Sequence, residues 1–452
     1  MSEFRCLSTI GMLGYGIPED SLRRGVARRP HMIGADAGST DAGPHKLGRG
    51  VPDVSRAATA RDLGLMIRAG KELGVPVVIG SAGGSGAAPH LEWTWEILRE
   101  VAARAGIPLR VALIWADVPR GWVAEGLAAG RVTPLGAAPP LDQATLQQTV
   151  SIVGQMGTEP IVRALDAGAE VVLAGRACDA AIFAAAAIRA GGDRGLAWHM
   201  GEILECGAMC AEPGSANDCM LGTLETDRFV IESMNPLRVC TPTSVAGHSL
   251  YERSHPWRSE GPGHVLDLSG CRFDALDERR VAVSGSRHQE TPLRIKLEGS
   301  ALAGYRTIVI GGVRDPIAIE RLDEMLEAVE HATQEYFALV GEADWSLRFV
   351  VYGRDGVMGA LEPVKQITTH EVGILLDVVA GTQELANTVC AYARSQLQHY
   401  HYKGILATGA NLAFPTAPSD TPCGSVYRYT VYHLAEVDDP CELFRLDLRE
   451  LS

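Results

Sequence analysis

Two carboxylates, two hydroxyls and three glycines stand together in residues 34–44 (GADAGSTDAGP), directly after a short apolar run. Asp36 and Asp41 could exchange a proton or hold a divalent metal, and Ser39 and Thr40 add hydroxyl groups for a substrate. Glycines adopt positive φ readily, so the backbone N–H groups of such a loop can converge on an anion. The alternative is an Asx-turn that caps the next helix. We expect a ligand-binding loop with Asp36 and Asp41 as catalytic groups.

A second polar loop is expected at the same edge of the fold. Residues 80–86 (GSAGGSG) contain only glycine, serine and alanine, so their backbone could approach an anionic or carbonyl group. We expect Gly83, Gly84 and Ser85 to contact the substrate and to stabilise charge on its oxygen. The segment lacks both the Lys-Ser/Thr ending of a P-loop and the dinucleotide spacing, and a tight turn between a strand and a helix is the alternative.

Arg176, Cys178 and Asp179 follow another apolar run. The Arg176 guanidinium could bind a substrate carboxylate or phosphate in bidentate fashion, or form a structural ion pair with Asp179. Cys178 stands where the next helix should begin, and a helix N-terminus beside an arginine lowers a thiol pKa. Cys178 is therefore a candidate nucleophile, with simple packing as the alternative. We expect Arg176 and Asp179 to bind the substrate.

The densest group of polar residues is the segment 198–210 (WHMGEILECGAMC). If it is helical, His199, Glu202 and Cys206 share one stripe. His199 and Glu205 are candidates for proton exchange, and Cys206 is a second candidate nucleophile. Core packing of the cysteines and a zinc site are the alternatives, although no paired CxxC spacing is present. Asn235, in a later loop, offers an amide to the substrate or stabilises a turn.

Short β-branched runs alternate with Ala- and Leu-rich amphipathic stretches over the first two thirds of the chain. This alternation predicts an α/β fold, a doubly wound and mostly parallel sheet whose carboxyl edge gathers the polar loops. The predicted strands are 5–10, 31–35, 75–79, 109–115 and 170–174, and the predicted helices include 57–73 and 160–167. Residues 238–262 are rich in Pro, Ser, Thr, Gly and His, which predicts a long ordered loop.

The pattern changes near residue 300. Strands at 305–310, 347–352 and 372–379 and helices at 316–337 and 383–400 predict a C-terminal α+β lobe of the ferredoxin-like kind. Thr382 is the expected N-cap of the last helix. We therefore expect one domain over residues 1–300 and a second over 301–452.

Composition narrows the class of protein. The chain has 452 residues, of which 46% are hydrophobic and 21% charged, with a net charge of −14. A chain this long can bury a large core, and its acidic balance argues against nucleic acid and anionic membrane as partners. Because no secretory leader or membrane span is evident, we expect a cytoplasmic protein with reduced thiols, and base rates favour a homo-oligomer.

Several long motifs resemble the acyclic terpene utilisation (AtuA-like) family. The resemblance rests on GADAGSTDAGP (34–44), GSAGGSGAAPH (80–90), AGRACDAAIFAA (174–185), LAWHMGEILECGAMCAEP (196–213), IESMNPLRVCTPTSVAGHSLYE (231–252) and GYRTIVIGGVRDP (304–316). It implies that residues 1–300 form the AtuA-like domain. It also implies a role in the catabolism of branched acids and their CoA thioesters, and some members carry a lyase label.

Three functions remain open at this point. We favour an enzyme, a hydro-lyase or other lyase or an isomerase, that moves a proton next to the carbonyl of a small carboxylic acid or CoA ester. The alternatives are a cysteine-dependent thioesterase or acyl transferase, and a non-catalytic accessory protein of an acyl-CoA carboxylase pathway. The favoured chemistry requires no cofactor, a CoA thioester enters as substrate, and a divalent metal at the carboxylates stays open.

Overall fold

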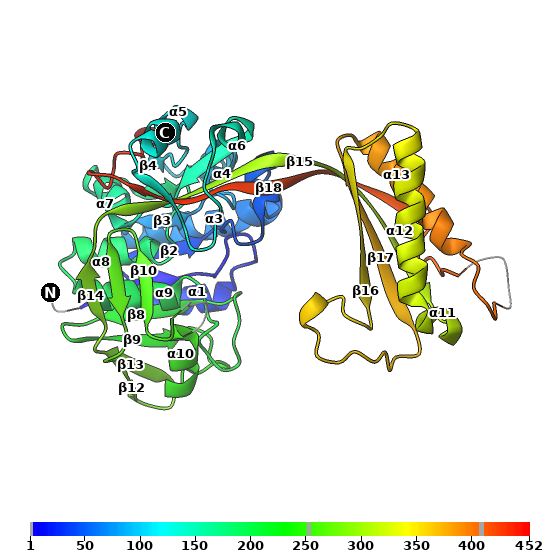
Figure 1. The fold of residues 1–452 in the computed structure, drawn as a ribbon. Helices are drawn as coiled ribbons and strands as arrows, with labels where there is room; N and C mark the ends of the chain where they lie inside the picture. The colour runs from blue at the N-terminus through cyan, green and yellow to red at the C-terminus, as the bar shows by residue number, and fades with distance from the viewer. Residues whose placement is uncertain (1–2, 251–254, 406–410) are drawn as a thin grey trace. The chain divides into compact units, whose positions relative to one another are not determined.

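The computed structural model describes residues 3–250, 255–405 and 411–452 of the chain (Figure 1). The chain forms two compact units: unit 1 comprises Met1–Ala301 and Tyr429–Ser452, and unit 2 comprises Leu302–Arg428. The C-terminal segment therefore belongs with unit 1. Whether residues 1–300 and 301–452 fold as independent domains stays a prediction, because compactness of the units does not test independent folding.

A ten-stranded sheet forms the centre of unit 1 and confirms the α/β class. Its middle strands are parallel and run in the order β1 (Phe4–Ser8), β2 (Met32–Asp36), β3 (Val77–Gly80), β7 (Val171–Ala174) and β4 (Leu109–Ile114). Antiparallel strands extend both sides: β8 (Met220–Leu224), β9 (Arg228–Ser233), β13 (Arg280–Ser284) and β12 (Arg272–Ala275) next to β1, and β19 (Leu446–Leu451) next to β4. All five predicted strands are present within a few residues of their expected bounds.

Both faces of the central parallel strands are buried, and successive side chains of a strand point to opposite faces. Leu7 packs in one core cluster with Met66 of α3, while its neighbour Cys6 packs in a second cluster with Phe183 of α8. The helices of unit 1 are α1 (Glu19–Ala27), α2 (Pro44–Arg49), α3 (Arg56–Leu73), α4 (Ala88–Ala105), α5 (Arg120–Ala128), α6 (Gln143–Gln148), α7 (Thr158–Asp166), α8 (Ala181–Arg189), α9 (Arg194–Leu204) and α10 (Pro242–Ser249).

The predicted loop over 238–262 contains two elements instead. Helix α10 begins after Thr241, whose side chain accepts the Ser244 N–H while the Ser244 hydroxyl accepts the Thr241 N–H, and Pro242 occupies its first turn. The Thr, Pro and Ser that indicated a loop are thus the residues of a helix N-terminus. Strand β10 (Arg258–Gly261) follows and pairs with β11 (His264–Asp267), which pairs with β14 (Arg287–Glu290). Residues 251–254 lie outside the described part.

Unit 2 is an α+β arrangement of antiparallel strands and helices. Its element order is β15 (Arg294–Val313), α11 (Pro316–Glu320), α12 (Leu322–Leu339), β16 (Trp345–Tyr352), a 3₁₀ turn at Gly359–Leu361, β17 (Val372–Ala380), α13 (Gln383–Gln398) and β18 (Asp420–Glu436). The strands lie in the order β16-β17-β15-β18. Thr382 caps α13 as predicted, by accepting the Leu385 N–H at 3.1 Å. The single helix expected at 316–337 is broken at Arg321 into α11 and α12.

Strands β15 and β18 begin or end in unit 1. There β15 pairs with β6 (Ser151–Gly154) and β18 pairs with β5 (Val132–Pro134). The alternation of Ile295 and Leu297 with charged residues in β15 buries the apolar side chains in the unit 1 core. The same alternation places Lys296 and Glu298 on the other face of the strand, from which Glu298 reaches the polar loops.

Candidate functional site

The polar loops after β1, β2, β3 and β7 lie against one another, as the parallel strand order requires. The Leu13 N–H donates to the Asp36 carbonyl at 2.7 Å, and the Ser81 N–H donates to the Gly175 carbonyl at 3.1 Å. At Gly38, where φ is +134°, an added Cβ would come within 2.8 Å of the Gly84 Cα. The two loops can approach this closely because position 38 carries no side chain. This packing fixes the carboxyl edge of the sheet as one polar surface.

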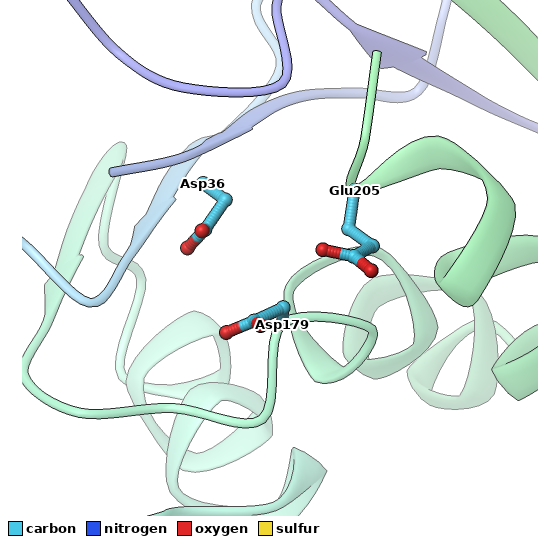
Figure 2. A group of neighbouring side chains, drawn as sticks. All are labelled: Asp36, Asp179 and Glu205. Atoms are coloured by element: carbon cyan, nitrogen blue, oxygen red, sulfur yellow. The ribbon is translucent and has the colours of Figure 1, made fainter. Parts of the chain in front are cut away.

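Three carboxyl groups converge at this edge, and we call them the carboxylate triad: Asp36, Asp179 and Glu205. Each offers one oxygen, and these oxygens lie within 4.8 Å of one another. Asp36 ends β2, Asp179 lies between β7 and α8, and Glu205 directly follows α9. Figure 2 shows the three carboxyl groups turned toward one shared space. All three were candidates in the sequence, and the structure brings them together.

Asp36 is the most buried member of the triad, with 6% of its surface exposed. Its Oδ2 accepts the Gly38 N–H at 3.1 Å, while its Oδ1 has no hydrogen-bond partner among the described residues. Burial raises the pKa of Asp36 well above its usual range; Asp179 and Glu205 raise it further, and Arg176 opposes them. Buried carboxylates crowded in this way hold protons or bind a cation.

Arg176 is fully inside the protein and is held by several acceptors. Its Nε donates to Glu298 at 2.9 Å, and its Nη1 donates to Asp179 at 3.0 Å and to the Ser81 hydroxyl at 3.1 Å. Burial acts to lower the pKa of Arg176, but Glu298 and Asp179 outweigh it and raise that pKa well above the usual range. The structural ion pair with Asp179, one of the two sequence interpretations, is therefore present. A substrate carboxylate would have to compete with these partners.

Glu298 is the residue that sequence reasoning missed. It is fully buried, and besides Arg176 it accepts the Lys296 ammonium at 2.7 Å and the Thr40 hydroxyl at 2.6 Å. Burial acts to raise the pKa of Glu298, but Arg176, Lys296 and Thr40 together lower it to about 2. The signal was available in residues 294–298 (RIKLE), where charges alternate with apolar residues that must be buried.

Thr40 and Ser39 are neighbours in the chain but have different hydrogen-bond partners. Thr40 is buried, and its carbonyl oxygen also accepts the hydroxyl of Tyr429. Ser39 donates its hydroxyl to Asp41 at 3.0 Å and accepts the Asp41 N–H in return. Asp41 is exposed; burial raises the pKa of Asp179, and the charge of Asp41 acts in the same direction, so Asp41 lies within electrostatic reach of the triad. Asp41 is thus an accessible carboxylate at the edge of the buried cluster.

Gly83, Gly84 and Ser85 lie in the loop between β3 and α4. Ser85 is fully buried, and its hydroxyl has no hydrogen-bond partner among the described residues. At Gly84 an added Cβ would lie 1.8 Å from Oδ2 of Asp53, so a carboxylate presses against this backbone. That carboxylate argues against an anion at Gly84 itself.

Of the remaining sequence candidates, His199 and Asn235 form hydrogen bonds with residues outside the triad. His199 is buried on α9, with Nδ1 2.8 Å from the Ser286 hydroxyl and Nε2 2.9 Å from the Ser249 hydroxyl. Asn235 donates to Asp218 at 2.6 Å and accepts the Leu237 N–H at 3.0 Å within a turn. Cys206 follows Glu205 directly. In the described part of the chain, the group of side chains suited to a metal contains carboxylates and no cysteine.

Cys178 is expected to react slowly with iodoacetamide. Burial raises the pKa of its thiol to about 12, and the nearby Asp179 and Glu202 act in the same direction, so the reactive thiolate is scarce at pH 8. Peptide mass spectrometry of a timed reaction should show that the exposed Cys423 is modified well before Cys178. Equal rates for the two cysteines would restore Cys178 as a candidate nucleophile.

Comparison with known proteins identifies the family. No curated protein and no solved structure matches the chain. In the described residues, no helix combines the length and the apolar character that crossing a membrane requires. A family model described as acyclic terpene utilisation family protein AtuA matches residues 60–419, which is more than half of the chain. The chain therefore belongs to the AtuA family of acyclic terpene utilisation.

Proposed function

We propose that this chain is an enzyme of the lyase or isomerase type that moves a proton next to the carbonyl of a small branched carboxylic acid or its CoA thioester. The observation that carries the proposal is the carboxylate triad with the accessible Asp41 beside it. Membership of a family named for acyclic terpene utilisation supports a branched, catabolic substrate. The broader role in terpene utilisation follows from the family, whereas the reaction type is our inference.

Asp41 is the group best placed to exchange the proton. Its carboxylate is exposed and anchored by Ser39, so it can meet a substrate without the cost of uncovering a buried charge. In the proposed step, Asp41 takes the proton from the carbon beside the carbonyl, and the electron pair of the C–H bond moves onto the carbonyl oxygen. A lyase then expels a leaving group from the neighbouring carbon, and an isomerase returns the proton to another carbon.

Arg176 contributes by positioning rather than by direct binding in this proposal. Its ion pair with Asp179 fixes one member of the triad, and its contact with Glu298 ties that loop to β15. The cysteine-dependent alternative loses support because the Cys178 pKa is raised to about 12. A general acid-base reaction instead depends on carboxylates, and these are the groups that lie together in the triad and at Asp41.

We also propose a fold class for each of the two units. We assign unit 1 to the doubly wound class because helices such as α3 and α8 pack on opposite faces of its parallel strands. We assign unit 2 to the ferredoxin-like class. Its β15-α12-β16-β17-α13-β18 order, with strands lying as β16-β17-β15-β18, has the β-α-β-β-α-β sequence of elements that defines that class.

Hydrogen exchange at the substrate carbon tests the proposed reaction. The full chain is incubated in D₂O with Mg²⁺ and with branched acids or their CoA thioesters, and NMR follows the C–H next to the carbonyl. We expect deuterium to enter that position in at least one substrate of the panel, and not with heat-denatured protein. Absence of exchange and of any product across both series would overturn the proposal.

A further inference from the structure

We infer that the carboxylate triad of Asp36, Asp179 and Glu205 binds one divalent cation that prefers oxygen ligands, Mg²⁺ or Mn²⁺. The role of this cation rests on the proposed function, because it would face the carbonyl oxygen on which negative charge develops. Its binding can be measured without any substrate.

The spacing of the triad suits such a cation. The three oxygens lie within 4.8 Å of one another, and oxygens on opposite sides of Mg²⁺ stand about 4.2 Å apart, at twice a bond length of about 2.1 Å. Small side-chain rotations would therefore bring all three into contact with one ion. Three protein ligands leave open positions for water or for a substrate oxygen, which is how Mg²⁺ is commonly held.

A second observation comes from the state of Asp36. The residue is 6% exposed, and its Oδ1 has no hydrogen-bond partner among the described residues although the Gly38 N–H holds its Oδ2. A buried carboxylate oxygen without a partner is costly, and such an atom in a native protein indicates a missing ligand. Figure 2 shows the Asp36 carboxyl group directed toward the space that Asp179 and Glu205 border.

The charges around the triad call for a cation rather than an anion. Among the groups that act on Asp36, two are carboxylates and one is the guanidinium of Arg176. That guanidinium is already shared with Asp179 and Glu298. An enolate formed here would add negative charge to an acidic site, and a divalent ion would offset it. All three ligands are carboxylates, which favours Mg²⁺ or Mn²⁺ over zinc.

Direct binding of Mn²⁺ tests the site. The full chain is freed of metal with a chelator and titrated with Mn²⁺, and electron paramagnetic resonance measures the free ion. We expect one Mn²⁺ per chain, displaced by Mg²⁺, and at least a tenfold weaker affinity in Asp36→Asn. The matched control is Asp117→Asn, which removes one charge after β4, outside the triad, and should bind like the original protein.

The outcomes separate this inference from the proposed function. Absence of Mn²⁺ binding, or equal affinity in Asp36→Asn and the original protein, would overturn the cation site. If circular dichroism shows that Asp36→Asn does not fold, Glu205→Gln takes its place with the same expected loss. Substrate exchange that persists unchanged in a chelator would overturn the role of the cation in the reaction while keeping the function. Mn²⁺ binding with neither exchange nor product across both substrate series would keep the site and overturn the function.

Discussion

Replacing Glu298 by glutamine is expected to lower the free energy of unfolding of unit 1 by about 3–5 kcal/mol, the usual cost of breaking a buried ion pair. Glu298 is fully buried between Arg176 and Lys296, which contact its carboxylate at 2.9 and 2.7 Å. The glutamine side chain has the same shape but no charge, so the variant removes the counterion that the buried Arg176 and the partly buried Lys296 share. Urea denaturation at pH 7, followed by circular dichroism, measures the difference.

Glu436→Gln is the matched control for this substitution. Glu436 is exposed on β18 and pairs with Arg294 at 3.3 Å, and an exposed pair of this kind contributes about 0–1 kcal/mol. We expect its free energy of unfolding to stay within that range of the original protein. If the free energy of unfolding fell by the same amount in both variants, the buried ion pairs of Glu298 would contribute no more than an exposed pair.

The stability that Glu298 provides also depends on pH in a defined direction. Folding lowers its pKa from 4.5 to about 2, which corresponds to about 3 kcal/mol. Because the folded pKa is the lower one, this contribution is complete above pH 4.5 and is lost as the pH falls through about 2. Asp36 and Asp179, whose pKa values are raised, act in the opposite direction. The difference between the original protein and Glu298→Gln should therefore shrink by about 2 kcal/mol from pH 7 to pH 3.

The sequence predicted the strands that position the site because their signal is local. Apolar runs such as the one before Asp36 are bounded by glycine loops, and helix α3 is bounded by the N-cap Ser55 and the C-cap Gly74. The parallel direction of the strands then follows from the α/β pattern, and with it the expectation that the loops share one edge. Helix α10 was missed because Thr, Pro and Ser at a helix N-terminus resemble a loop when no apolar stripe follows them.

The grouping of the site residues could not be predicted in the same way. Asp36, Asp179 and Glu205 were each candidates, but from three separate motifs, and nothing local indicates that the residue after α9 returns to the end of β2. Glu298 lies 258 positions from Thr40 and 122 from Arg176, although it contacts both. A partnership over such separations is set by tertiary packing alone. The roles of His199 and Asn235 as site residues stay predictions, since their observed hydrogen bonds are also those of structural residues.

Asp41→Asn is expected to abolish most of the proton exchange while leaving the fold intact. The substitution replaces the carboxylate that accepts the proton with an amide that cannot accept it. Loss of a general base typically costs about 10²–10⁴-fold in rate. The turn itself should survive, because the Asp41 N–H still donates to the Ser39 hydroxyl. The measurement is the rate of deuterium entry next to the substrate carbonyl, with circular dichroism as the check on folding.

The same change at an exposed position elsewhere serves as the control for Asp41. Asp20 on α1 pairs only with a neighbouring exposed arginine in the contacts described, so Asp20→Asn should exchange deuterium at the original rate. Ser39→Ala should fall between the two variants, because it loses the hydroxyl that orients the Asp41 carboxylate but keeps the carboxylate itself. If Asp41→Asn instead retains full exchange, Asp41 is not the base of the proposed step. The Mn²⁺ titration then decides separately whether the triad binds a cation, because it requires no substrate.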